Sequence, residues 1–177
     1  MTADAGVTVK MLTNDNVRMR ISDFRVSAGS TTTVQHSHPT LRWPVGAAGE
    51  ATPTPIFFEP GIEHTVDNGA GQHDVREIVF EVLQGAEGVW GEEIVVALEG
   101  KARFKTLIGT ALNFENKVCR ATELRMAPSG GVAEDIMHQH VLDYGLCFLG
   151  GTHLKFWHPN LAGGKPELQK EEHLDDG

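Results

Sequence analysis

The chain has 177 residues, with 15 Lys and Arg against 24 Asp and Glu, and a formal net charge of −9 at pH 7. This length allows one large domain or two small fused domains with a sizeable core. An acidic chain without a basic stripe does not suit nucleic acid, because phosphate contacts need clustered Lys and Arg. No apolar run approaches the roughly 20 residues of a membrane-spanning helix. We therefore expect a globular protein that binds neither nucleic acid nor membrane.

The first residues and the cysteines indicate a cytoplasmic protein. Residues 1–6 have no basic start followed by an apolar stretch, so we expect no secretory signal. Cys119 and Cys147 lack the spacing of metal-binding cysteines. In a cytoplasmic chain we expect both to be reduced thiols in the core rather than a disulfide.

Strand-like patterns dominate the chain. The clearest is a period of two that places Ile78, Phe80 and Val82 on one face and Glu77 and Glu81 on the other. Other segments alternate in the same way or form short apolar runs rich in β-branched residues. The segments expected to form strands are 17–22, 75–83, 94–98, 146–149 and 154–157.

Turn residues separate these strands and suggest the domain organisation. No stretch has a long helical pattern, so we expect an all-β sandwich or barrel. Residues 39–55 are rich in Gly and Pro and do not have the pattern of a strand. The Gly-rich, acidic segment 84–93 predicts a linker between a first unit, 1–83, and a second unit, 94–177. The charged residues 168–177 are expected to form a solvated or disordered tail.

The two units share a repeated segment. Residues 19–26 and 119–126 match with Arg opposite Arg twice, Asp opposite Glu, and Ser opposite Thr. A His-x-His step follows each copy, at 36–38 and at 138–140. Two histidines at i and i+2 on an extended strand point to the same face, which is one way for a sheet to bring two imidazoles to one metal. The repeat therefore predicts two related β-units, each built on the plan of a metal site.

The first unit contains two motifs that carry a family resemblance. A Gly precedes His36-Ser37-His38, and a Pro60-Gly61 pair is followed by two residues, His64, three residues and Asn68. These are similar to the two cupin motifs, although Pro60 is displaced by one place. In such a chain the Pro-Gly turn returns the strand that carries His64 to the side of the His-x-His strand.

The resemblance implies a cupin fold, a double-stranded β-helix or jelly-roll barrel, in two repeated bicupin-like units. It also implies that His36, His38 and His64 bind one divalent transition metal, such as Fe, Zn, Ni, Mn or Cu. Three imidazoles suit these metals and leave coordination positions for water or substrate. The Glu ligand of the family is missing, because Arg42 or Trp43 stands at its place.

The second unit resembles the opposite half of the pattern. His138 and His140 are followed by Asp143, which could stand in for the family Glu with a gap one residue short. The resemblance implies that these three residues are metal ligands. Nothing from residue 154 onward matches the second cupin motif. Three explanations stay open: strands supplied by the N-terminus or another subunit, a truncated chain, or a decayed site.

These features lead to two hypotheses of function. The first is a metal-dependent cupin enzyme, of the oxygenase, isomerase or lyase type, that acts on a small polar metabolite. The alternative is a ligand-binding or structural cupin without catalysis, in which the metal sites have decayed. An incomplete second barrel would leave strand edges to be covered, so we also expect a homodimer.

Overall fold

The structure is a computed structural model that describes residues 6–13, 18–46, 52, 54–83, 111–123, 145–150, 152–158 and 167–176. Within these residues every regular element is a β-strand, and the strands pair antiparallel. The all-β class expected from the sequence is therefore confirmed for this part of the chain. No helix in these ranges is long and apolar enough to cross a membrane. The predicted linker, the predicted strand 94–98, His138, His140 and Asp143 lie outside the described residues.

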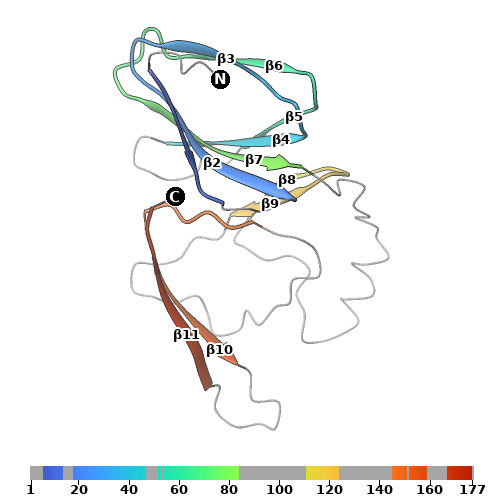
Figure 1. Ribbon diagram of the computed structural model, residues 1–177, viewed down its shortest axis with the longest axis vertical. Coiled ribbons are helices and arrows are strands. Elements are labelled where there is room, and N and C mark those ends of the chain that lie inside the picture. Colours follow the sequence, from blue (N-terminus) through green and yellow to red (C-terminus); the bar gives the residue numbers. More distant parts are fainter. Residues whose placement is uncertain are drawn as a thin grey trace.

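A five-stranded antiparallel sheet is the largest element (Figure 1). In spatial order its strands are β1 (Val7–Met11), β2 (Met19–Val26), β7 (Val75–Val82), β4 (Thr40–Val45) and β5 (Ile56–Phe58). Three two-stranded sheets accompany it. They are β3 (Thr31–Gln35) with β6 (Glu63–Asp67), β8 (Ala111–Glu115) with β9 (Arg120–Glu123), and β10 (Thr152–His158) with β11 (Glu167–Leu174).

The side of the five-stranded sheet that packs against β3 and β6 is here called the inner face. Its apolar part consists of Phe24, Val26 and Val79, which form one buried cluster with Val66 of β6, and Val34 of β3 packs against this cluster. Directly opposed residues of antiparallel strands lie on the same side of a sheet. The pairing of Phe24 with Glu77 therefore also places Glu77 on the inner face.

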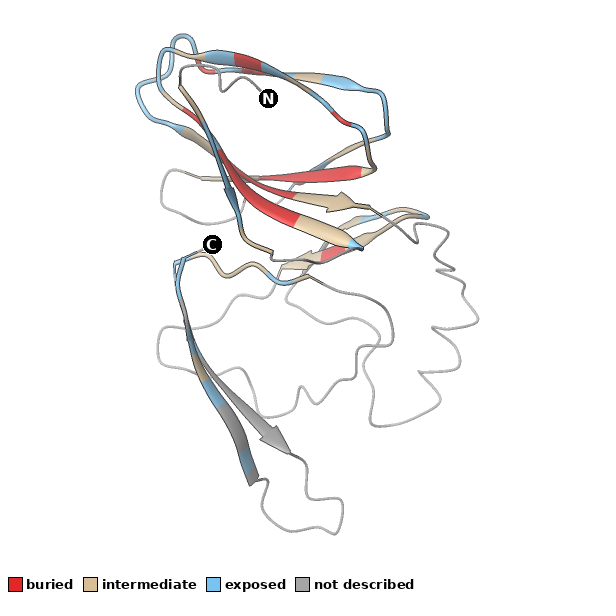
Figure 2. Cartoon of the chain, viewed as in Figure 1, coloured by how far each residue is buried: buried red, intermediate tan, exposed pale blue. Residues whose placement is uncertain are grey.

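The opposite side, called the outer face, is covered by residues from the segments 111–123 and 145–150. A Cβ atom added at Gly145 would lie 2.6 Å from Cδ1 of Ile21 and 2.7 Å from Sδ of Met19, so the chain passes close to β2 here. A second apolar cluster lies over β4 and β5. It contains Leu41, Trp43 and Ala121, with Phe57, Phe80 and Phe114 partly buried around them. Burial on both sides explains why the most buried stretches of the chain run along β2, β4 and β7 (Figure 2).

The two faces predicted for β7 are confirmed, and the structure adds which face is which. Phe80 packs in the apolar cluster of the outer face. Glu77 and Glu81 lie on the inner face, where Glu81 is paired across the sheet with Arg20. The polar side of this strand therefore faces the other sheet of the first unit and not bulk water. Burying polar groups costs free energy unless they are paired. The polar groups of the inner face are therefore candidates for a functional site.

Two local predictions were wrong around β4 and before β10. Residues 40–45 form β4, although the segment 39–55 did not have the pattern of a strand. Pro44 is tolerated because it lies past Thr40–Arg42, the part of β4 that pairs with β5. Residues 146–149 were expected to form a strand and have no strand assignment, and Leu146 is 60% exposed. In this apolar run hydrophobic and polar residues do not alternate, so it lacks the pattern of a strand with one buried face.

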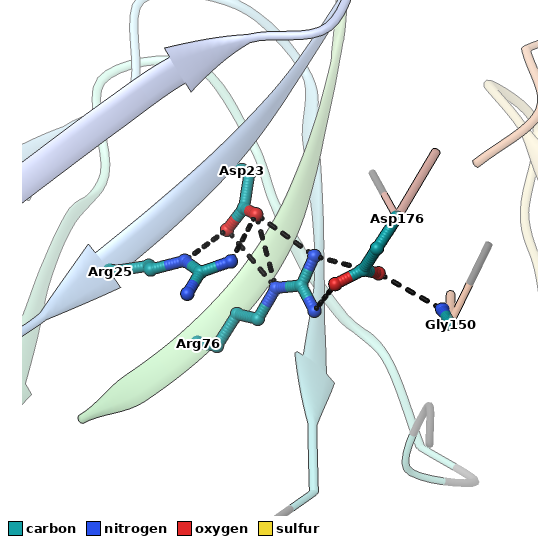
Figure 3. A network of polar contacts seen from close by, with 5 residues as sticks. All are labelled: Asp23, Arg25, Arg76, Gly150 and Asp176. Atoms are coloured by element: carbon teal, nitrogen blue, oxygen red, sulfur yellow. Dashed lines mark hydrogen bonds and ion pairs between the residues drawn. The ribbon is translucent and has the colours of Figure 1, made fainter. Parts of the chain in front are cut away.

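The predicted tail is exposed at most of its described positions, as expected, but it is ordered, because β11 occupies Glu167–Leu174 and the next residues are anchored. Asp176 accepts hydrogen bonds from Nη1 and Nη2 of Arg76 at 3.0 and 3.2 Å and from the backbone N–H of Gly150 at 3.0 Å. Arg76 and Arg25 also donate to Asp23 (Figure 3). The carboxylate of Asp176 in the tail thus belongs to a hydrogen-bonded network on the outer face.

The described residues leave the predicted repeat untested and settle the state of the thiols. The second copy of the repeat, 119–126, is described only as far as Glu123, and it contains the short strand β9. Cys119 and Cys147 are both free thiols, as expected, but they are half-buried and not in the core. Burial raises the pKa of each thiol to about 11.

Candidate functional site

A tight turn brings His64 beside His36. Gly61 has a φ of 86°, a conformation that favours glycine, and its N–H donates to the carbonyl of His36 at 2.6 Å. The N–H of His36 donates in turn to the carbonyl of Ile62 at 3.0 Å. Beyond the turn β6 pairs with β3, with Val34 opposite His64. The role predicted for the Pro60-Gly61 turn is therefore confirmed.

The rings of His36, Phe58 and His64 form a packed group. Phe58 stacks on His36 with ring centroids 4.6 Å apart and contacts His64 at the same distance in a tilted arrangement. The two imidazole centroids are 6.4 Å apart. His36 is only 3% exposed, and its Nε2 atom has no hydrogen-bond partner within the described residues. A buried imidazole nitrogen without a partner is rare in a folded protein.

His38 does not join this group, because the chain bends between the two sheets. β3 belongs to the sheet with β6, whereas β4 belongs to the five-stranded sheet, so residues 36–39 must turn a corner. Nδ1 of His38 lies 3.0 Å from Oγ of Ser37, and the backbone carbonyl of His38 accepts from Oγ1 of Thr40 at 2.8 Å. The same-face argument for i and i+2 holds only on an extended strand, and this step is not one.

Arg42 is the most deeply buried charged residue of the inner face. The whole residue is 1% exposed, and Nε donates to Oε2 of Glu77 at 2.6 Å. Nη2 forms an ion pair with the same oxygen, yet makes no hydrogen bond within the described part of the chain. The guanidinium also lies over the ring of Phe24, with Cζ 4.3 Å from the ring centroid.

A second arginine–glutamate pair lies beside the first and nearer to solvent. Nε and Nη2 of Arg20 donate to Glu81 at 2.5 and 2.9 Å. The side chains of Arg20 and Glu81 are 38% and 18% exposed, against 1% and 7% for Arg42 and Glu77. The polar strip on the inner face thus runs from a buried end at Arg42 to a more accessible end at Arg20.

The surroundings of His36 and His64 favour neutral imidazoles. Burial lowers the pKa of both rings, and the positive charge of Arg42 lowers each pKa further. For His36 the neighbouring His64 acts in the same direction, and Glu81 opposes the shift. At neutral pH each ring therefore offers one N–H donor and one acceptor nitrogen.

The described residues supply only part of the metal site that the cupin resemblance implies. Two of the three predicted ligands, His36 and His64, lie together, but no three His, Cys, Asp or Glu side chains among the described residues form a group that could hold a metal ion. A guanidinium stands beside the imidazoles, and its charge opposes a divalent cation. A metal at this place would need further ligands from elsewhere in the chain.

Reasoning from sequence did not single out the Arg42–Glu77 pair. Two signals were present, namely Arg42 at the place of the family Glu and the alternation that puts Glu77 and Glu81 on one side of β7. The sequence did not indicate which side of β7 faces the sheet formed by β3 and β6. Asn68 also gains a defined role, since its side-chain amide donates to the carbonyls of Val26 and His73 at 3.0 and 2.9 Å and so fixes the turn after β6.

Comparison with known proteins found matches only among solved structures. No protein-family model matches the chain, and no curated protein matches it. Among solved structures, a match is the crystal structure of a cupin domain from Bordetella pertussis Tohama I, which is 14% identical. The match covers 46% of this chain and 98% of that domain, with a TM-score of 0.29. The likeness concerns the fold alone, and no residue role is taken from it.

Proposed function

We propose that the chain is a cupin-type protein that binds a small polar ligand on its inner face, beside His36 and Arg42. The observation that carries this proposal is Nε2 of His36, which has no partner within the described residues although the residue is 3% exposed. Leaving such a group unpaired costs about 1–3 kcal/mol. A polar group that a ligand would satisfy accounts for this cost.

The neighbouring residues fit a binding site better than a structural core. Arg42, Glu77, Arg20 and Glu81 place four charged side chains on one side of the sheet. A core built only for stability would gain by replacing such pairs with apolar residues. Their exposure rises from Arg42 towards Arg20, which provides a direction of approach from solvent.

A thermal-shift screen of small polar metabolites tests the proposal, with His36→Phe as the test variant. A ligand at about 100 times its Kd stabilises the folded state by roughly 2.7 kcal/mol, which raises Tm measurably. We expect at least one compound to raise Tm of the wild type and to have no effect on His36→Phe. His73→Phe is the matched control, because His73 is exposed. A screen in which no compound acts on the wild type would contradict the proposal.

The second candidate is the metal-dependent enzyme predicted from the sequence. The nearness of His36 and His64, with Nε2 of His36 unpartnered, favours it. Elemental mass spectrometry of the wild type, His64→Ala and His138→Ala tests it. About one metal per chain that is lost in either variant would support a metal centre and place it, whereas absence of metal after reloading would exclude this candidate. The homodimer and the cytoplasmic location stay predictions.

A further inference from the structure

We infer that the ligand of the inner face is a small carboxylate, bound by the guanidinium of Arg42 and the imidazole of His36, with Arg42 supplying the positive charge that a metal supplies in the family pattern. This inference rests on the proposed function and specifies its ligand. It concerns only residues that the structure describes.

Two buried nitrogens lack a complete set of hydrogen bonds within the described residues. Nε2 of His36 has no hydrogen-bond partner, and Nη2 of Arg42 is ion-paired with Glu77 but makes no hydrogen bond. A guanidinium nitrogen can only donate, and an imidazole Nε2 donates in one of its two neutral tautomers. The remaining N–H of Arg42 therefore needs an acceptor, and Nε2 of His36 can donate to the same ligand in that tautomer. A carboxylate has two acceptor oxygens and no donor, and hydrogen bonds to charged groups are about twice as strong as neutral ones.

The carboxylates of the inner face are already engaged. Glu77 accepts from Arg42, and Glu81 accepts two hydrogen bonds from Arg20. A cationic ligand would find no unpaired carboxylate there and would meet the charge of Arg42. Phe58, which stacks on His36, is paired with Thr40 of β4, two residues from Arg42 on the same face of the sheet. The guanidinium thus lies on the side of the sheet that faces His36, which favours an anion over a cation.

The hydrocarbon part of the ligand would lie towards the rings. Phe58 and His64 are half-buried and stack beside His36, so they offer an apolar wall next to the donors. Glu81 lies on the more accessible side, and its charge acts on both His36 and Arg42. A second negative group on the ligand would meet this carboxylate, which favours a monocarboxylate.

An NMR titration with acetate, acetamide and methylammonium tests the inference, because the three probes have similar size and different charge. The full-length protein is first dialysed against EDTA and shown by elemental analysis to be free of metal. We expect acetate to give saturable shifts at the backbone amides of residues 36, 42 and 64. Acetamide should bind about tenfold more weakly or worse, as expected when one charge-assisted hydrogen bond is lost. Methylammonium should give no saturable shift.

Variants identify the group responsible. Arg42→Met should abolish the preference for acetate over acetamide. Since this variant leaves Glu77 buried without its partner, the double variant Arg42→Met/Glu77→Gln provides a form without either charge. Arg25→Met is the control, because Arg25 pairs with Asp23 on the outer face and its side chain is 44% exposed. It should retain the acetate preference of the wild type.

Several results would overturn the inference while leaving the proposed function intact. Equal binding of acetate and acetamide, or a preference for methylammonium, would show that the ligand is not a carboxylate. Acetate binding that disappears on metal removal would show that a metal supplies the charge. Acetate binding that survives in the double variant would place it away from Arg42. Failure of the proposed function itself is seen separately, as a metabolite screen without any hit.

Discussion

The two faces of the five-stranded sheet both bury charged residues, but only one face completes their hydrogen bonds. On the outer face Asp23 accepts from Arg25 and Arg76, and Asp176 joins Arg76 to Gly150 (Figure 3). On the inner face Nη2 of Arg42, although ion-paired with Glu77, and Nε2 of His36 make no hydrogen bond within the described residues. A completed polar network rigidifies a structure, whereas an incomplete one marks a place where a further group is expected.

The contrast between the two faces shows that burial of a charged residue alone does not identify a functional site. Asp23 and Arg42 are both almost fully buried, at 2% and 1% exposure. Asp23 holds the segment around Asp176 against β2 and β7, which is a structural role. Arg42 places its guanidinium beside two imidazoles and an aromatic ring, which is an arrangement suited to binding a ligand.

The largest loss of stability is expected from Arg42→Met on the inner face. Removing one partner of a buried ion pair leaves the other charge uncompensated and costs about 3–5 kcal/mol. The double variant Arg42→Met/Glu77→Gln removes both charges and should recover most of that loss. Urea unfolding of the two variants measures the difference. Equal stability of the single and double variants would mean that Glu77 finds another partner when Arg42 is absent.

On the outer face, Asp23→Asn should lower the free energy of unfolding by about 2 kcal/mol. The loss is smaller because Arg76 retains Asp176 and Arg25 is partly exposed, so neither guanidinium is left buried and unpaired. Binding of acetate should not change, because the inner face is untouched. Loss of acetate binding in this variant would show that the two faces are coupled, and it would weaken the division of roles argued above.

A gain of stability is expected from His36→Phe. The substitution removes an unpartnered buried nitrogen and keeps a ring that can stack on Phe58. Removal of the desolvation cost should stabilise the fold by about 1 kcal/mol while ligand binding is lost, a common exchange at functional sites. Thermal unfolding measures the change against His73→Phe. A destabilised His36→Phe would indicate that Nε2 has a partner in the folded protein.

The two faces should also respond to acid in different pH ranges. The folded pKa of His36 and His64 is depressed, so below their ordinary value of about 6.5 the unfolded chain takes up protons that the folded chain does not. Stability from the inner face is therefore present above about pH 6.5 and falls as the pH drops below it. His36→Phe should flatten this part of a plot of unfolding free energy against pH.

The outer face should lose its contribution only in stronger acid. Burial acts to raise the pKa of Asp23 and Asp176. Hydrogen bonds from Arg25 and Arg76 to Asp23, and from Gly150 and Arg76 to Asp176, outweigh it together with the charges and lower both pKa values. The network therefore contributes fully above their ordinary value of about 3.9 and is lost as the pH falls through the lower folded pKa. An Asp23→Asn variant should show a reduced slope in this range, while its slope near pH 6 should match the wild type.

The smallest effect is expected from Asp176→Asn, at most about 1 kcal/mol. Its side chain is 44% exposed, so solvent screens the pair with Arg76. Hydrogen exchange should nevertheless report faster exchange at the amide of Gly150, which donates to Asp176. Unchanged exchange at this amide would show that Asp176 does not anchor the segment 145–150 in solution.

The sequence was sufficient to predict the all-β class of the fold and the nearness of His36 to His64. Alternation of period two depends only on the chain and predicted β2 and β7. The Pro60-Gly61 turn also depends only on nearby residues, because the tight turn before β6 needs the positive φ that Gly61 adopts. Local rules failed for β4, which pairs with the distant strand β7, for residues 146–149, which form no strand, and for β11, which pairs with the preceding strand β10.

Tertiary structure alone decided which polar residues matter. The sequence marks Glu77 and Glu81 as one side of β7, but the side that faces β3 and β6 depends on the cover that residues 111–123 and 145–150 place over the other side. For the same reason Arg42 could be recognised as a departure from the cupin pattern but not as the partner of Glu77. Periodicity determines which residues share a face, whereas the packing of distant segments determines whether that face meets water, a core or a ligand.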